Sequence, residues 1–152
     1  MMKNLVLIFL TLFMLSCSTK KEEPLREEEL IGKWTNLSLL VTMKRLEKED
    51  SILHAKEGEW EKVLKIKPIL SEFKDDGTFK AQYSNLDEEI IKEDEGKWFI
   101  RNDSLVIVID GHETTYHFTV NNDRVMYKAH LDWDGEGHKN DYYDGVQIKV
   151  KE

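Results

Sequence analysis

The chain has 152 residues, and its 30 Asp and Glu against 22 Lys and Arg give a formal net charge of −8. This acidic balance argues against nucleic acid as a partner, because affinity for phosphate backbones comes largely from Lys and Arg side chains that neutralise them. The length suits a single domain with one hydrophobic core.

The first seventeen residues have the pattern of a secretory leader. Lys3 precedes the apolar run 5–15, which is too short to cross a bilayer, since a spanning helix needs about 20 residues. The run ends at Leu15-Ser16-Cys17, and Cys17 is the only cysteine. This ending resembles the lipobox of bacterial lipoproteins, in which the cysteine is lipidated and becomes the first mature residue. The resemblance implies a signal peptide over 1–16 and a lipid anchor on Cys17.

Residues 17–29 follow as a polar, charged segment without apolar periodicity, which predicts a flexible tether between the lipid and a domain over 30–152. The run Lys20-Lys21-Glu22-Glu23 resembles the signals of surface-exposed lipoproteins of the Bacteroidetes type. A solvated charged linker is the alternative interpretation. The resemblance implies the outer membrane of a bacterial envelope. The sequence does not decide between the periplasmic and the surface-exposed face of that membrane.

From Gly32 onward, apolar residues recur with a period of two, which is typical of β-strands. Tight turns such as Asp76-Gly77 and Asp110-Gly111 separate the runs, and Asp-Gly between apolar runs is a strong hairpin signal. About eight strands joined in this way predict an all-β antiparallel meander that closes as a barrel, with a sandwich as the alternative. The predicted strands cover 37–43, 63–70, 79–83, 98–100, 105–109, 116–120, 125–133 and 146–150.

Two segments do not show strand alternation. Residues 44–59 are highly charged and predict a long loop or short helix between the first two strands. Residues 86–94 predict a helical turn or an extended hairpin loop. Because long loops in compact domains often act as lids, the first segment is the candidate lid of a binding site.

Several short motifs suggest a family. The opening Leu30-Ile31-Gly32-Lys33-Trp34 resembles the Gly-x-Trp signature that begins the first strand of lipocalins. The pieces 73–79, 96–98 and 103–105 resemble parts of the lipocalin-like lipoproteins of Bacteroidetes. The resemblance covers roughly residues 30–150 and implies a lipocalin-like (calycin) barrel of about eight strands.

Gly32 and Trp34 form the structural signature of this resemblance. A glycine beside a large aromatic residue lets the chain pass close under the core while the ring plugs the base of the barrel. Gly96 and Trp98 repeat the arrangement, so we expect both tryptophans to be structural, with a ligand role as the alternative. The resemblance also implies an arginine on the last strand that stacks on Trp34, and here Lys149 is the nearest substitute.

A barrel of this size is just wide enough inside to hold one small ligand or to be filled by its own side chains. The inward-facing residues could therefore line a site for a small hydrophobic molecule, with tyrosine hydroxyls that orient it, or they could form a solid core. The sequence leaves both interpretations open. The residues predicted to face inward are Leu39, Val41, Phe79, Tyr83, Trp98, Tyr116, Phe118 and Tyr127.

The segment 132–141 is a candidate calcium loop, because hard oxygen ligands cluster around a glycine turn. Position 12 of such a loop is Tyr143 instead of the closing glutamate, and no helices are expected beside it. An acidic hairpin turn is the alternative interpretation. The candidate ligands, at positions 1, 3, 5 and 9 of an EF-hand-like loop, are Asp132, Asp134, Glu136 and Asn140.

The sequence contains no Gly-x-Ser-x-Gly elbow, no thiol besides Cys17 and no Gly-rich phosphate loop followed by Lys-Ser/Thr. We therefore predict that the protein is not an enzyme and that it needs no cofactor apart from the candidate calcium ion. The expected function is binding of a small hydrophobic ligand by a membrane-anchored, lipocalin-like lipoprotein. The alternative is a surface interaction or inhibitor module with a filled barrel and an unknown protein partner.

Overall fold

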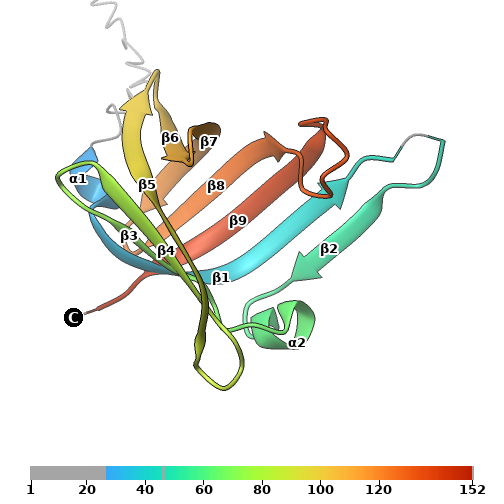
Figure 1. The fold of residues 1–152 in the computed structure, drawn as a ribbon, viewed down its shortest axis with the longest axis horizontal. Helices are drawn as coiled ribbons and strands as arrows, with labels where there is room; N and C mark the ends of the chain where they lie inside the picture. The colour runs from blue at the N-terminus through green and yellow to red at the C-terminus, as the bar shows by residue number, and fades with distance from the viewer. Residues whose placement is uncertain (1–26, 46, 152) are drawn as a thin grey trace, which may run out of the picture.

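A computed structural model describes residues 27–45 and 47–151 (Figure 1). The predicted signal peptide over 1–16, the predicted lipidation site Cys17 and the predicted tether as far as residue 26 lie outside the described residues. Within the described ranges, no helix combines the length and the apolar character needed to cross a membrane.

In this part of the chain, nine antiparallel strands form one sheet. Each strand from β3 to β8 pairs with the next, and β1 pairs with both β3 and β9, which closes the sheet. The predicted antiparallel barrel is confirmed, with β2 as an extra strand outside it. The elements are α1 (Glu27–Leu30), β1 (Gly32–Met43), β2 (Ser51–Ala55), α2 (Trp60–Leu64), β3 (Leu70–Phe73), β4 (Thr78–Ser84), β5 (Ile90–Arg101), β6 (Ser104–Ile109), β7 (His112–Asn121), β8 (Arg124–Leu131) and β9 (Asp141–Lys149).

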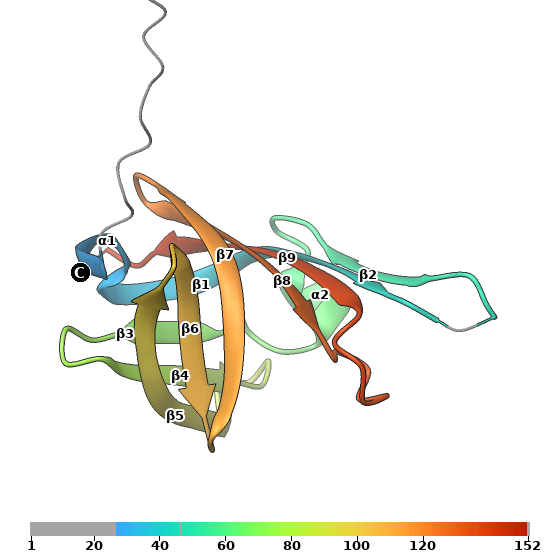
Figure 2. The same ribbon diagram turned by 90° about the horizontal axis from the view of Figure 1, so that it is seen from above.

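Strand β1 is longer than the barrel wall. Its first residues, 32–35, pair with β3, whereas 39–43 pair with β2. A β-bulge between Asn36 and Ser38 separates the two halves, and β9 pairs with both. The second half of β1 therefore forms a hairpin with β2 that projects away from the barrel (Figures 1 and 2).

Two local predictions are wrong. Residues 63–70 do not form a strand, because α2 continues to Leu64 and β3 begins only at Leu70. Residues 44–59 contain β2, although they lack clear strand alternation. The physical reason is that periodicity cannot separate a short apolar strand from a short buried helix, and the partner that completes the packing lies elsewhere in the chain. For residues 86–94, the structure has the extended hairpin, since β5 begins at Ile90.

The main core closes one end of the barrel, which we call the base. The Trp34 indole N–H donates to the Leu30 carbonyl oxygen of α1 at 2.7 Å, and the Trp98 indole N–H donates to the Lys74 carbonyl oxygen at 2.9 Å. The Trp98 ring meets Phe73 edge-on, with centroids 5.4 Å apart. These contacts satisfy both indole N–H groups while the rings exclude water. The core cluster is Leu30, Trp34, Phe73, Phe79, Ala81, Trp98, Leu105, Phe118, Val125 and Tyr127.

A minor core joins the β1–β2 hairpin to α2. Its buried members are Leu39, Val41, Ala55 and Trp60. The Trp60 indole N–H donates to the Lys67 carbonyl oxygen at 3.2 Å, which ties α2 to the segment that leads into β3. This packing gives the hairpin an apolar face of its own, outside the barrel.

Candidate functional site

The barrel contains a cavity of about 400 Å³ above the main core. Every one of the strands that close the barrel contributes lining side chains. The volume lies in the range of roughly 300–1,000 Å³ that is usual for small-molecule sites. The barrel is therefore hollow over part of its length, not filled throughout.

The mouth of the cavity lies opposite the base. Gly32 at the start of β1 pairs with Phe73, so the meander brings the β3–β4 and β5–β6 turns to the base and the β6–β7 turn to the other end. Asp110 and His112, on either side of that turn, line the cavity. Lys92 and Asp94 also line it and form an ion pair at 2.8 Å. The charged lining groups thus gather towards the mouth.

The wall between mouth and base is rich in tyrosine. Tyr116 lies at the centre of this group, with ring centroids 5.8 Å from Tyr127 and 5.9 Å from Tyr143, both in edge-on geometry. Tyr83 also lines the cavity, and the ammonium of Lys92 lies 4.9 Å from its ring centroid. Aromatic walls of this kind provide a large apolar contact area and carry hydroxyl groups that can orient a ligand.

Burial keeps these tyrosines in the neutral form. It raises the pKa of Tyr116 to about 12, and it raises the pKa of Tyr83 to about 12 with a further contribution from the Asp94 carboxylate. Burial also raises the pKa of Tyr127 and of Tyr143 well above the ordinary value. The phenol groups, uncharged at neutral pH, therefore remain uncharged hydrogen-bonding groups at moderately alkaline pH as well.

One side of the cavity base is polar, beside apolar side chains of the main core. Asn36 on β1 lies opposite Gln147 on β9. The Gln147 Nε2 group donates to the Ser71 hydroxyl at 3.2 Å. Asn36 is 6% and Gln147 8% exposed, and both line the cavity. In the described part of the chain, two buried atoms here, Asn36 Oδ1 and Gln147 Oε1, have no hydrogen-bond partner, and Tyr127 Oη on the adjoining wall has none either. Leaving such a group unpaired costs about 1–3 kcal/mol, so the base has unmet hydrogen-bonding capacity.

The structure separates the residues that were predicted to face inward. Phe79, Tyr83, Tyr116 and Tyr127 line the cavity. Leu39 and Val41 belong instead to the minor core, because β1 beyond its bulge faces α2 and β2. Trp98 and Phe118 lie in the main core and are not among the cavity-lining residues.

The candidate lid lies away from the cavity. None of the described residues between 44 and 59 lines it, and the hairpin that contains them projects sideways from the barrel (Figures 1 and 2). This position corrects the expectation that the segment covers the mouth, and the physical reason is that Leu53 and Ala55 pack in the minor core.

The sequence analysis missed most of the lining residues, among them Asn36, Gln147 and Tyr143. Asn36 precedes the bulge, which shifts the phase of alternation in β1. Gln147 faces inward although its apolar neighbours Val146 and Ile148 had suggested the opposite phase. Tyr143 fits inside because Gly145 follows it on the same face: a Cβ at Gly145 would lie 2.5 Å from the Tyr143 hydroxyl. A glycine two residues after an aromatic residue is the one signal that could have indicated this arrangement.

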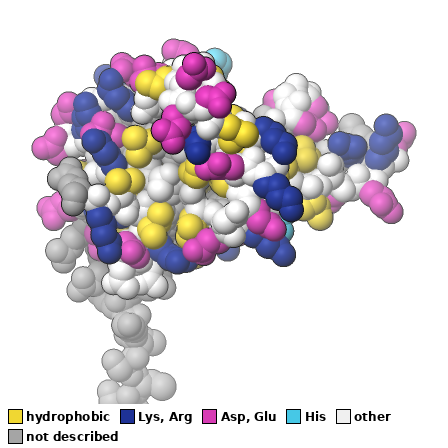
Figure 3. Space-filling view, turned by 90° about the horizontal axis from the view of Figure 1, so that it is seen from below, with side chains coloured by type: hydrophobic (Ala, Val, Ile, Leu, Met, Phe, Trp, Pro, Cys, Tyr) yellow, Lys and Arg dark blue, Asp and Glu magenta, His cyan; other side chains and the backbone are white. Residues whose placement is uncertain are grey.

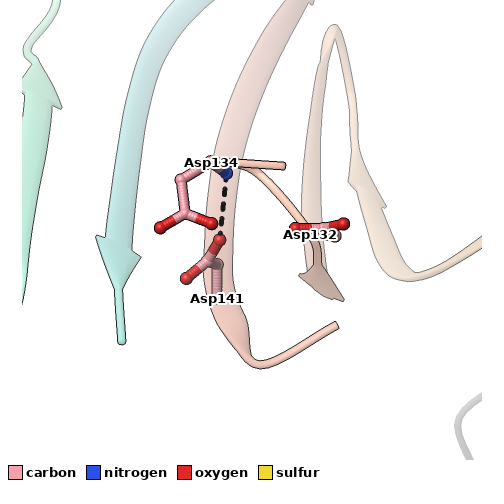
Figure 4. A group of neighbouring side chains, drawn as sticks. All are labelled: Asp132, Asp134 and Asp141. Carbon is pink, nitrogen blue, oxygen red and sulfur yellow. Dashed lines mark hydrogen bonds between the residues drawn. The ribbon is translucent and has the colours of Figure 1, made fainter. Parts of the chain in front are cut away.

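The β8–β9 loop brings three carboxylates together (Figure 4). One oxygen each of Asp132, Asp134 and Asp141 lies within 4.8 Å of the others. Asp141 is fully buried and organises the loop: its Oδ1 accepts from the Lys44 amide at 2.9 Å, and its Oδ2 accepts from the Trp133 amide at 2.8 Å and the Asp134 amide at 3.3 Å. The acidic hairpin turn is therefore present, with a buried carboxylate at its centre.

The remaining candidate ligands of this loop contact each other. The Asn140 Nδ2 group donates to Glu136 Oε1 at 2.8 Å, and neither residue belongs to the group of three carboxylates. The structure thus groups Asp132 and Asp134 with Asp141, which the sequence analysis did not include. Calcium binding by this loop stays a prediction.

The outer surface carries both signs of charge. Lys and Arg side chains are mixed with Asp and Glu over the face shown in Figure 3, with hydrophobic side chains between them. Lys80 on β4 forms an ion pair with Glu95 on the neighbouring β5, and Arg101 on β5 forms one with Glu113 on β7. Exposed pairs of this kind contribute little stability, about 0–1 kcal/mol each.

The strand order, the closure of β1 onto β9 and the cavity within define the class of this protein, a lipocalin-like β-barrel. No known family model matches the sequence, and no curated protein is significantly similar to it. Among solved structures, the chain is similar to a lipocalin-like protein from Bacteroides uniformis, at 13% identity and a TM-score of 0.47 over 80% of this chain and 99% of that chain. It is also similar to an uncharacterized protein from Bacteroides eggerthii, at 12% identity and a TM-score of 0.46 over the same shares. The class itself rests on the strand order of this chain.

Proposed function

We propose that this protein is a membrane-anchored, lipocalin-like lipoprotein that binds a small, largely apolar molecule inside its barrel. The observation that carries the proposal is the cavity of about 400 Å³ with its aromatic wall. Apolar cavities with a few placed polar groups are typical of small-molecule sites. The alternative of a filled barrel has less support, because it would leave this cavity without a role. The proposed role is binding, not catalysis.

The position of α1 supports an orientation for the anchored protein. Leu30 belongs to the main core, and the Glu29 carbonyl oxygen accepts from the Lys149 ammonium at 3.4 Å, so the described chain begins at the closed base. A tether from a lipidated Cys17 would join the barrel at this end. We propose that the mouth faces away from the bacterial outer membrane, towards the side from which a dissolved ligand arrives.

Native mass spectrometry tests the proposed binding. The described residues contain the closed sheet and both cores, so a chain that begins at Ser18 keeps the whole barrel. We expect a co-purifying hydrophobic molecule at about one per chain, or uptake of an added fluorescent lipid analogue. A ligand-free mass together with no uptake would contradict the proposal and favour a protein-interaction module.

A further inference from the structure

The base of the cavity has a chemical character different from its wall. Two side chains more than nine-tenths buried, Asn36 and Gln147, each carry an unpartnered polar atom there, and the equally buried Tyr127 on the adjoining wall carries a third. They come from adjacent strands β1, β9 and β8, and the register places Asn36 directly opposite Gln147. Main-core side chains, including the Trp34 ring, close the barrel at this end. All three residues line the cavity.

We propose that this base receives an uncharged head group that both donates and accepts hydrogen bonds, such as a hydroxyl or a primary amide, while the hydrocarbon part of the ligand points to the mouth. The inference rests on the proposed ligand binding and specifies the chemical class of the ligand. An amphipathic alcohol or amide is the expected class, and a fatty acid is not.

The need for a donating and accepting head follows from the free atoms. Two amide oxygens accept hydrogen bonds, and a phenol hydroxyl both donates and accepts. Gln147 already uses its Nε2 group on Ser71, so its oxygen is the end that remains free. If either amide rotates by half a turn, a donor replaces the acceptor, and the same head group still satisfies it.

The need for an uncharged head follows from the surroundings. Amides carry no charge, and burial holds Tyr127 in its protonated form. The charged residues that line the cavity, Lys92, Asp94, Asp110 and His112, gather towards the mouth. A carboxylate at the base would lose its hydration without meeting a cation, which is costly in a buried site.

The apolar part of the ligand has its own partners. Tyr116, together with Ile107 and Ile109 on β6, lines the cavity. This wall excludes water from a hydrocarbon chain, whereas the opposite orientation would place the chain against the unpaired amides. The orientation with the head at the base is therefore the one that gives the unpaired amide groups a hydrogen-bonding partner.

Calorimetry with three ligands of similar length tests the inference on the chain that begins at Ser18. The probes are 1-octanol, octanoate at neutral pH, and 1-chlorooctane measured in competition with octanol. We expect octanol to bind about tenfold more tightly than either of the others, because only octanol can pair with the base without bringing a charge.

Substitutions at the base test which residues cause the preference for octanol. Asn36→Leu combined with Gln147→Met removes the free amides, and we expect it to weaken octanol binding about tenfold while chlorooctane binding stays the same or improves. The matched control is Gln82→Met on β4, an amide that does not line the cavity, which should change neither affinity. Circular dichroism and retained chlorooctane binding establish that the double variant is folded. The comparison of the three ligands on the unmodified chain remains a valid test even if the double variant does not fold.

The outcomes separate the two proposals. Equal binding of octanol and chlorooctane, or tightest binding of octanoate, overturns the polar-head inference and leaves hydrophobic binding standing. The absence of binding by all three compounds overturns both. Octanol preference that survives the double variant also overturns the inference, since other groups would then recognise the head.

Discussion

The ammonium of Lys149 lies 5.1 Å from the centroid of the Trp34 ring. Lys149 thus occupies the place that the lipocalin resemblance gave to a stacking arginine. Gly32 makes the contact possible: its φ is +125°, and a Cβ there would lie 3.1 Å from Lys149 Cε. The first and last barrel strands and α1 therefore close the base together, which holds the polar layer of Asn36 and Gln147 in place above it.

The contact between Lys149 and Trp34 is expected to contribute measurable stability. Lys149→Met should lower the free energy of unfolding by about 0.5–1 kcal/mol, because a cation over an aromatic face is worth about that much at a partly exposed site. Urea denaturation measures the change. Lys151→Met, at an exposed position just beyond β9, is the control. An equal effect of the two substitutions would show that the ring contact contributes nothing.

Gly96 is required by the close approach of β5 and β6. A Cβ at this position would lie 2.0 Å from the Val108 carbonyl oxygen, so the two strands would have to separate. Gly96→Ala should therefore cost about 3 kcal/mol, in the upper range for single substitutions. Gly111→Ala provides the comparison, because nothing lies within 4 Å of its Cβ and only the positive φ of +78° is strained, at about 1–2 kcal/mol. Thermal unfolding of both variants should show the larger loss of stability for Gly96→Ala. A smaller loss for Gly96→Ala than for Gly111→Ala would contradict the prediction.

The buried tyrosines predict loss of stability at alkaline pH. Folding raises the pKa of Tyr83 and Tyr116 from 10.0 to about 12, so their contribution is complete below pH 10 and is lost as the pH rises towards 12. The sign follows because the unfolded chain releases these protons first. Phenolate absorbance and near-ultraviolet circular dichroism, followed together, should change in the same pH range. Ionisation of all tyrosines near pH 10 with the fold intact would contradict the prediction.

Asp141 is expected to be the main support of the β8–β9 loop. Asp141→Ala leaves three backbone N–H groups, on Lys44, Trp133 and Asp134, without their carboxylate acceptor. Hydrogen bonds to a charged group are worth about 1.5–3 kcal/mol, so a loss of about 3 kcal/mol or more is expected. Asp134→Ala is the control, since that carboxylate is exposed. Denaturant unfolding together with limited proteolysis of residues 132–140 measures both effects, and similar losses for the two variants would count against a special role of Asp141.

Lipidation of Cys17 is tested in a bacterial host. Cys17→Ser should leave the precursor unprocessed and stop labelling by a fatty-acid probe, because the side chain that forms the thioether is gone. Ser18→Ala is the control and should be processed normally. Labelling of the Cys17 variant would show that the leader is not a lipoprotein signal.

The sequence by itself determined the antiparallel meander. Alternation along β4, β6, β7 and β8 and turns such as Asp110-Gly111 are local signals, since strand periodicity and turn conformation depend on neighbouring residues. The bend at Asp110 illustrates this: Asp110 and Gly111 both have positive φ, as the two-residue hairpin turn requires.

Only the tertiary structure decided which face points inward and whether the barrel is hollow. Alternation defines two faces of a strand, but the bulge after Asn36 and the closure of β1 onto β9 choose the inner one, and they bring Asn36 and Gln147 together across 111 residues of chain. The same closure sends Leu39 and Val41 into a second core. The presence of a cavity depends on the combined volume of side chains from every barrel strand. These side chains come together only in the closed sheet.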